Sequence, residues 1–217
     1  MRHTEDQMQA PRRKLSRPER RLQLIDATIT VMAAHGYART TLAEVARAAG
    51  LSHGLANFHF ETKERLLSAT LDHLSEEYRN NWQSALASAG PDAASALAAM
   101  LMADFNPEIC RPDKLSAWCS FWGEAQSRPM YQEHCGSNDA AHIAILEGLC
   151  ARMINDHGYG GDPVRIARVL RVTSEGVWLD MITTQSPYAR EEALATVWAC
   201  AAAFFPRHFD QSGPIRG

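Results

Sequence analysis

Apolar residues recur at intervals of three or four positions through most of this 217-residue chain. This spacing is typical of α-helices that bury one face and expose the other. The first such segment begins near Pro18, and Gly36 can end it in a left-handed conformation. Its apolar face comprises Leu22, Ile25, Ile29 and Met32. No stretch alternates with the period of two that marks a half-buried strand, so the sequence predicts an all-α protein.

Capping residues divide the next segment into short helices. Thr41 and Glu44 have the spacing of a capping box, which starts a second helix that ends at Gly50. Ser52 can cap a third helix, and Thr62 can cap a fourth. The apolar stripe of the fourth helix comprises Leu66, Leu67, Leu71, Leu74 and Tyr78. Beyond this stripe, Gly and Pro residues separate five further predicted helices, which gives about nine in total.

The bulk composition disfavours several classes of protein. No run approaches the roughly 18 to 20 apolar residues of a membrane span, and the N-terminus lacks the apolar core of a signal peptide. The five cysteines include no Cys-x-x-Cys pair, which argues against a disulfide framework or a zinc ribbon. We therefore expect a cytoplasmic globular protein with mostly buried thiols.

Charge is distributed unevenly along the chain. Residues 1–67 hold 11 Lys and Arg against 7 Asp and Glu, whereas residues 68–217 hold 11 against 18. A basic first third on an acidic body favours a polyanion, such as nucleic acid, as the partner of the N-terminal part. A flexible basic tail over residues 1–16 accounts for about half of the excess by itself.

The segment that follows Gly50 has the form of a helix-turn-helix, whose second helix lies in the major groove of DNA. Leu55 and Phe58 are expected to point into the domain. The residues left to face outward are His53, Gly54, Asn57 and His59. Asn57 can make a bidentate contact to adenine. Lys63 lies in the first turn of the fourth helix, where a cation is unfavourable unless an anion such as a DNA phosphate binds nearby.

The same residues resemble the N-terminal signature of the TetR family of one-component repressors. The matching positions, from about residue 20 to 67, are Gly36, Thr40, Thr41, Val45, Ala46, Ala49, Gly50, Leu51, Ser52, Gly54, Phe58, His59, Phe60, Lys63, Leu66 and Leu67. The resemblance implies a DNA-binding domain over residues 17–67 and a ligand-binding and dimerisation domain over residues 68–217. The DNA-contacting candidates it implies are Thr40, Thr41, Ser52, His53, Gly54, Asn57, His59 and Lys63.

Aromatic residues of the body suggest a branch of this family. Trp118, Phe121 and Trp122 share one helical face. This segment, together with Pro129 and Met130, with Asp104-Phe105-Asn106 before it and with Glu175-Gly176-Val177-Trp178-Leu179 after it, resembles the C-terminal domain of the BetI branch. Members of that branch include the choline-responsive repressor of glycine betaine synthesis. A quaternary ammonium ion binds best to aromatic faces. The candidate cage comprises Trp118, Phe121, Trp122, Tyr131 and Trp178, with Glu124 or Asp180 as counter-charge. An aromatic stripe at this spacing is also compatible with an ordinary core.

The last two predicted helices, over residues 162–183 and 186–208, resemble the dimerisation pair of the family. Their apolar stripes comprise Ile166, Val169, Leu170, Thr173 and Val177 in the first and Leu194, Val197, Trp198, Ala201 and Phe205 in the second. We expect a homodimer that binds double-stranded operator DNA and that a small ligand releases. The resemblance implies no catalytic residue, metal or cofactor, and no membrane partner.

Three other interpretations remain open from the sequence. A regulator of this family could sense a hydrophobic or acyl ligand and control efflux or lipid genes. An enzyme or metal site could use His134, Cys135, Asp139 and His142, which lie within one short stretch. A helical scaffold without DNA binding does not explain Gly54, Asn57 and Lys63 together.

Overall fold

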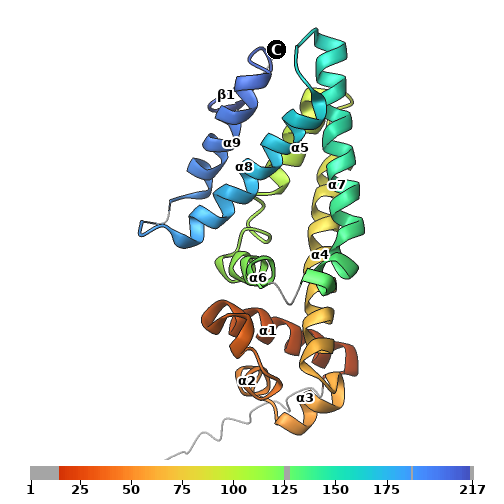
Figure 1. Cartoon of the computed structure of the whole chain (residues 1–217), viewed down its shortest axis with the longest axis vertical. Helices are drawn as coiled ribbons and strands as arrows, with labels where there is room; N and C mark the ends of the chain where they lie inside the picture. The colour runs from red at the N-terminus through yellow and green to blue at the C-terminus, as the bar shows by residue number, and fades with distance from the viewer. Residues whose placement is uncertain (1–14, 125–127, 187, 216–217) are drawn as a thin grey trace, which may run out of the picture.

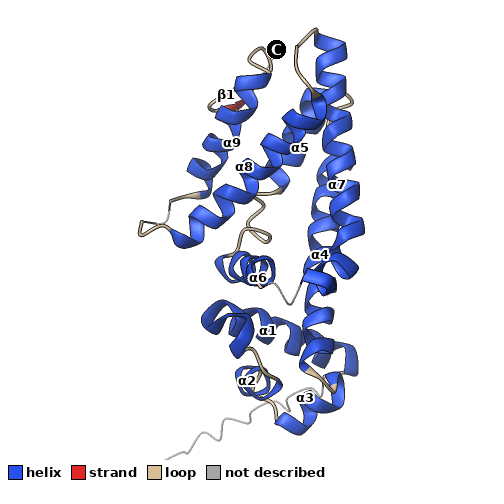
Figure 2. Ribbon diagram, viewed as in Figure 1, coloured by secondary structure: helices blue, strands red, loops and turns tan. Residues whose placement is uncertain are grey.

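The computed structural model describes residues 15–124, 128–186 and 188–215, which form nine α-helices and one two-stranded antiparallel hairpin (Figure 2). The predicted all-α class is therefore confirmed. The elements are α1 (Arg17–Arg39), α2 (Leu42–Ala48), α3 (His53–Phe60), α4 (Lys63–Ala87), α5 (Ala93–Ala103), α6 (Pro112–Gly123), α7 (Arg128–His157), α8 (Pro163–Thr183), α9 (Arg190–Phe204), β1 (Phe209–Asp210) and β2 (Gly213–Pro214).

Helices α1, α2 and α3 form one end of an elongated molecule, and α4 runs from this end into the body beside α7 (Figure 1). Buried side chains form two clusters. The first joins α1–α3 to the first half of α4 and also includes Ala117, Trp118 and Phe121 of α6 and Cys135 of α7. The second fills the body. The N-terminal end therefore shares its core with α6 and the start of α7.

Helix α1 has the predicted helical period, but its buried face is centred on different residues from those predicted. Leu24, Thr28 and Val31 are buried together with Ile25, whereas Leu22 is 44% exposed. The buried stripe of α1 is wider than the four predicted apolar residues, and Leu22 lies at its edge, where it is partly exposed. Gly36 has a φ of 77° and interrupts the helix as predicted, before a last turn that ends at Arg39.

The predicted caps hold α2, α3 and α4 in place. The side chains of Thr41, Ser52 and Thr62 each accept a hydrogen bond from the backbone N–H three residues later, over 3.2 Å. Gly50 has a φ of 67° and follows the last turn of α2. The predicted capping box at Thr41 is only half present, because the Glu44 carboxylate pairs with Arg47 instead of the Thr41 backbone. A full capping box is formed by Ser16 and Glu19 at the start of α1.

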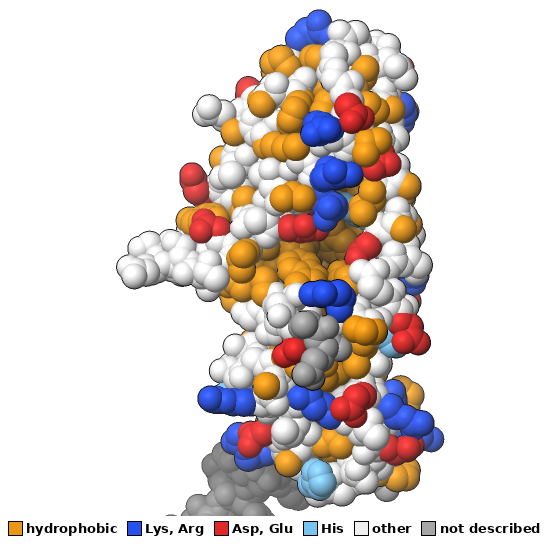
Figure 3. All heavy atoms as spheres, viewed as in Figure 1, with side chains coloured by type: hydrophobic (Ala, Val, Ile, Leu, Met, Phe, Trp, Pro, Cys, Tyr) orange, Lys and Arg blue, Asp and Glu red, His pale blue; other side chains and the backbone are white. Residues whose placement is uncertain are grey.

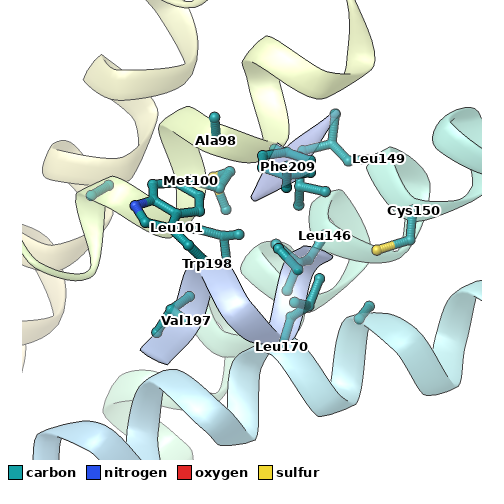
Figure 4. Close-up of a cluster of buried hydrophobic side chains, with 14 of the residues drawn as sticks. Ala98, Met100, Leu101, Leu146, Leu149, Cys150, Leu170, Val197, Trp198 and Phe209 are labelled. Carbon is teal, nitrogen blue, oxygen red and sulfur yellow. The ribbon is translucent and has the colours of Figure 1, made fainter. Parts of the chain in front are cut away.

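The core of the body lies between α5, α7, α8, α9 and the hairpin (Figure 4). Trp198 stacks on Phe209 with ring centroids 5.8 Å apart, which fixes the C-terminal segment against α9. Most of the two stripes assigned to dimerisation lie in this core, including Leu170, Val177 and Val197. These residues are buried within one subunit because α8 packs on α7, and α9 packs on α8 and the hairpin of the same chain.

A buried ion pair joins α4 to α6. The Lys114 ammonium, on a side chain only 8% exposed, lies 2.6 Å from the Glu77 carboxylate and also donates to the carbonyl of Glu108 over 2.8 Å. A buried charge without its partner is strongly destabilising, so this pair holds the two helices in a fixed relation.

Over the described residues, no helix is both long enough and apolar enough to cross a membrane. All five cysteines are free thiols. Most of the predicted basic tail, residues 1–14, lies outside the described residues.

Candidate DNA-binding surface and ligand cavity

The helix-turn-helix presents a polar surface at the end of the molecule. Helices α2 and α3 meet across the turn at Gly50, and α3 exposes His53, Gly54 and Asn57, as the sequence predicts. Ala56 and Phe60 of the same helix are buried in the N-terminal core. The caps Thr41 and Ser52 are also exposed. Helix α3 thus has the two different faces that a DNA-reading helix needs.

Phe58 and His59 are placed opposite to the prediction. Phe58 is 65% exposed, whereas His59 is 8% exposed and packs beside α1. Arg21 of α1 donates a hydrogen bond to the His59 carbonyl over 2.7 Å, and this contact sets the rotation of α3. Burial, together with the charges of Arg17 and Arg21, lowers the pKa of His59. His59 is therefore a core residue of the domain.

Thr40 and Lys63 also differ from the expectation of direct contact with DNA. Thr40 is fully buried, and its hydroxyl donates to the Gly36 carbonyl over 2.9 Å. The Lys63 ammonium donates to the carbonyls of Tyr37 and Ala38 and lies 4.9 Å from the Tyr37 ring centroid. A cation at the C-terminal end of a helix satisfies its free carbonyls and its dipole. Lys63 therefore attaches α4 to the end of α1.

A cavity of about 280 Å³ lies inside the body. Figure 3 shows a hollow midway along the molecule, with hydrophobic side chains inside it and charged side chains around it. Its walls come from α4, the end of α5, α6, α7 and α8. The lining residues are Tyr78, Asp104, Trp118, Trp122, Tyr131, Asp139, His142, Ile143, Arg171, Ser174, Glu175 and Trp178.

Aromatic rings form one wall of this cavity. Trp122 lies between Trp118 and Trp178, with ring centroids 6.0 Å and 6.4 Å away and with nearly parallel ring planes. Tyr131 meets Trp118 edge to face, and Tyr78 meets Trp178 in the same way. Four of the five predicted cage residues therefore come together, from three different helices.

Three carboxyl groups line the cavity with one arginine. The Asp104 side chain accepts a hydrogen bond from Tyr78 over 2.8 Å, and Asp139 accepts one from Tyr131 over 3.0 Å. Glu175 pairs with Arg171 over 2.6 Å. Acidic groups thus outnumber basic ones around the aromatic wall, and a cationic guest is favoured electrostatically.

Burial controls the protonation of the polar groups. It raises the pKa of Asp104 to about 6, although the hydrogen bond from Tyr78 opposes this shift. Burial also raises the pKa of Asp139, and it lowers the pKa of His142 to about 4, so that His142 is neutral at pH 7. A charged carboxylate in this site is costly without a cation beside it.

The remaining predicted ligand residues lie elsewhere. Phe121 is 1% exposed and belongs to the N-terminal core, where its ring meets Tyr37 edge to face at 6.0 Å. Glu124 and Asp180 do not line the cavity; Asp180 accepts a hydrogen bond from Tyr188. Phe121 lies one position before Trp122 on α6, so the two rings point to different sides of the helix.

Helix α6 therefore separates two environments. Trp118 and Trp122 line the cavity, and Trp118 also packs with Ala117 and Phe121 in the N-terminal core. Helix α1 lies directly below α6 (Figure 1). Helix α6 is thus in contact with both the cavity and α1.

The residues of the alternative enzyme or metal site do not converge. His134 binds Asp72 at the surface, whereas Asp139 and His142 line the cavity. Cys135 is fully buried, and burial raises the pKa of its thiol to about 12, which makes the thiolate nucleophile inaccessible at neutral pH. Within the described segments, no three His, Cys, Asp or Glu side chains are placed to hold a metal ion.

Comparison with known proteins is consistent with this architecture of a helix-turn-helix and a helical ligand domain. Residues 24–70 match the family of bacterial regulatory proteins of the tetR type, and residues 93–206 match the C-terminal domain of the BetI-type transcriptional repressor. The class is thus that of bacterial helix-turn-helix transcriptional regulators. More particularly, the chain belongs to the TetR family of transcriptional repressors and is of the BetI type.

Individual relatives agree with this assignment. The BetI regulator of Paraburkholderia phytofirmans is 36% identical over 81% of this chain and 88% of its own length. The BetI regulator of Paraburkholderia xenovorans is 31% identical over 82% of this chain and 89% of its own. In fold, the chain resembles a protein from Saccharomonospora viridis, assigned as a transcriptional regulator and crystallised with choline. That protein has a TM-score of 0.71 and 16% identity over 83% of this chain and 94% of its own.

The sequence did not predict several polar residues of the cavity as ligand residues. They come from separate segments: Tyr78, Asp104, Asp139, His142 and Glu175. Asp104 and Glu175 lie within stretches that carry the BetI resemblance, so this resemblance is a sequence signal that could have identified them as ligand candidates. Tyr78 has the spacing of a core residue, and the position of Asp139 on the cavity side of α7 depends on how α7 packs.

Asp104→Asn is expected to change stability in a pH-dependent way. The raised pKa of Asp104 means that its protonated form stabilises the fold at low pH and that this contribution is lost as the pH rises through about 6. Asparagine stays neutral and still accepts from Tyr78. The variant should match the wild type near pH 4 and exceed it by about 2 to 3 kcal/mol at pH 8 in urea unfolding. Asp156→Asn, at an exposed position, is the control. An equal difference at both pH values would contradict the assignment.

Proposed function

We propose that this repressor binds operator DNA as a homodimer and is released by a small cation, choline or a related quaternary ammonium compound. The observation that carries the ligand class is the cavity itself, in which an aromatic wall faces three carboxyl groups and a single arginine. A quaternary ammonium ion donates no hydrogen bond, and it gains its binding energy from aromatic faces and opposite charge. The choline-bound neighbour of similar fold supports the same ligand.

The alternative of a hydrophobic or acyl ligand is less well supported. A fatty acyl carboxylate would have to lie near Asp104, Asp139 and Glu175, and like charges in a buried site are unfavourable. A neutral hydrophobic compound would leave Asp104 and Asp139 without a compensating charge. The same groups become favourable contacts when the ligand is a cation.

The DNA-binding proposal uses the exposed residues of the helix-turn-helix. His53, Gly54 and Asn57 of α3 are placed to meet base edges and the sugar-phosphate chain, with Thr41 and Ser52 at the two helix starts. Thr40, His59 and Lys63 act indirectly in this proposal, because they hold α1, α3 and α4 together.

The dimer proposal uses the exposed side of α8. Val169, Val172 and Leu179 are 38%, 51% and 49% exposed and lie on one stripe with Gly176 between them. Exposed apolar stripes of this kind favour burial against a partner. Two copies of α8 and α9 can cover one another across a two-fold axis, and each operator half-site, about 34 Å from its twin, then receives its own α3.

Coupling between the two sites follows from shared helices. Tyr78 of α4 binds Asp104 at the cavity, and Lys63 of the same helix binds the end of α1. Helix α6 contacts the cavity on one face and the N-terminal core on the other. A ligand that prefers the released arrangement by about 2.7 kcal/mol changes operator occupancy about a hundredfold.

The principal test is binding of the intergenic DNA upstream of the protein's own gene, measured by fluorescence anisotropy with and without choline. Salt-sensitive, sequence-selective binding that choline relieves supports the whole proposal. Selective binding that ignores choline removes the ligand assignment and keeps the repressor. Tight choline binding without any change in operator affinity removes the release mechanism.

Asn57→Ala is expected to reduce affinity for the operator by about 1 to 3 kcal/mol and to leave affinity for random DNA unchanged. Asparagine reads adenine through two hydrogen bonds, whereas random DNA is held by phosphate contacts. Competition titrations with both duplexes measure the difference. Arg79→Ala, at an exposed residue sixteen positions further along α4 than Lys63 and paired with Glu76, is the matched control. Equal losses on both duplexes for Asn57→Ala would refute its role in base reading.

Trp122→Leu is expected to weaken choline binding about 2- to 30-fold in isothermal titration calorimetry, whereas Trp122→Phe should lose less. Each aromatic face contributes about 0.5 to 2 kcal/mol to the binding free energy of a cation. Trp122 is 37% exposed, so its replacement leaves no large internal void. The neutral isostere 3,3-dimethylbutan-1-ol is the matched ligand control. Comparable affinities for choline and the isostere would rule out the cation site.

Val172→Arg is expected to give a monomer at micromolar concentration in size-exclusion chromatography with light scattering, because it buries two like charges at the two-fold axis. Operator affinity should fall with it. Met102→Arg, at a similarly exposed apolar residue of α5, should stay dimeric. A dimeric Val172→Arg protein would place the interface elsewhere.

A further inference from the structure

Phe58 is a large apolar residue on the surface of α3. The proposed contact of Asn57 with base edges does not explain why this residue is exposed. Phe58 is 65% exposed, the largest exposed fraction among the large hydrophobic residues of the described segments. It belongs to the same exposed face as Gly54 and Asn57, at spacings of four and one residues. On a helix that reads base edges, an exposed apolar ring can make apolar contacts in the major groove.

Gly54 leaves the surface beside this ring open. Residues four positions apart are neighbours on a helix surface, so Phe58 lies next to Gly54 on the exposed face of α3. A Cβ atom added at Gly54 would meet nothing within 4 Å, so the surface there is open. The open surface over Gly54 next to the exposed Phe58 side chain is called the notch.

Two contacts at the base of the ring restrict its position. The Arg17 guanidinium, from the start of α1, lies 5.7 Å from the Phe58 ring centroid, and the His59 ring meets it edge to face at 5.3 Å. Arg17 is itself exposed and adds a positive charge beside the notch. The notch is therefore a partly ordered apolar site with a cation next to it, which suits a group at the edge of a polyanion.

We propose that the notch between Gly54 and Phe58 holds the 5-methyl group of a thymine in each operator half-site, so that Phe58 is a specificity-determining residue. The proposal rests on the proposed binding of operator DNA by α3. In the major groove, thymine is distinguished by this methyl group, and a phenylalanine side chain can contact it. Asn57, the adjacent residue, is suited to adenine, so the pair would read neighbouring A·T base pairs.

The test uses the full-length protein and upstream operator duplexes in which each thymine of a half-site is replaced in turn by deoxyuridine, which lacks only the methyl group. Replacement of one particular thymine in each half-site should lower the affinity of the wild-type protein about fourfold, which corresponds to the free energy of burying one methyl-sized group. Phe58→Ala should bind the thymine and deoxyuridine duplexes equally. Phe58→Leu, which keeps apolar contact, should retain part of the preference.

The outcomes distinguish a failure of the notch from a failure of the proposed DNA binding. Because Phe58 is exposed, its replacement does not disturb the core, and circular dichroism of the variants checks their folding. Selective operator binding with no thymine sensitive to methyl removal overturns the notch and keeps the repressor. A methyl effect that persists in Phe58→Ala assigns the methyl group to another residue and also overturns it. Absence of any selective binding by the wild type overturns the proposed function and the notch with it.

Discussion

The packing of α6 between two hydrophobic environments is the contact on which the rest of the structure depends. This helix contributes Trp118 and Trp122 to the cavity, and it contributes Phe121 and part of Trp118 to the core shared with α1. The buried pair of Lys114 and Glu77 holds α6 to α4. Because protein interiors are close-packed, a displacement of α6 cannot be absorbed locally and must move its neighbours. The cavity and the DNA-binding end are therefore mechanically joined.

The chemistry of the cavity reflects a balance between burial and charge. Asp104 is 4% exposed and has its pKa raised to about 6, so near neutral pH the site holds a carboxylate under desolvation. Retaining such a group reduces the stability of the ligand-free protein, and perturbed carboxyl groups of this kind are enriched at functional sites. A cation beside Asp104 would relieve this penalty, which is a physical reason for the cavity to favour a cationic ligand.

Local sequence signals predicted much of the DNA-binding end. Thr41, Ser52 and Thr62 cap helices as their positions indicate, and Gly36 and Gly50 adopt the positive φ angles expected at breaks. These features depend on residues within a few positions of one another. The rotation of α3 was mispredicted at Phe58 and His59, because eight residues accommodate more than one apolar stripe and the contact from Arg21, 38 positions away, selects between them.

By itself the sequence determined the all-helical class, the helix boundaries marked by caps and glycines, and an aromatic-rich body, because these follow from periodicity and short-range hydrogen bonds. Tertiary packing decided which side of each helix became a cavity wall. It brought Asp104, Asp139 and Glu175 to the aromatic residues and removed Phe121 from them. It also turned Lys63 toward the end of α1. Such placements depend on how α4, α6, α7 and α8 cross in space, and no local spacing encodes those crossings.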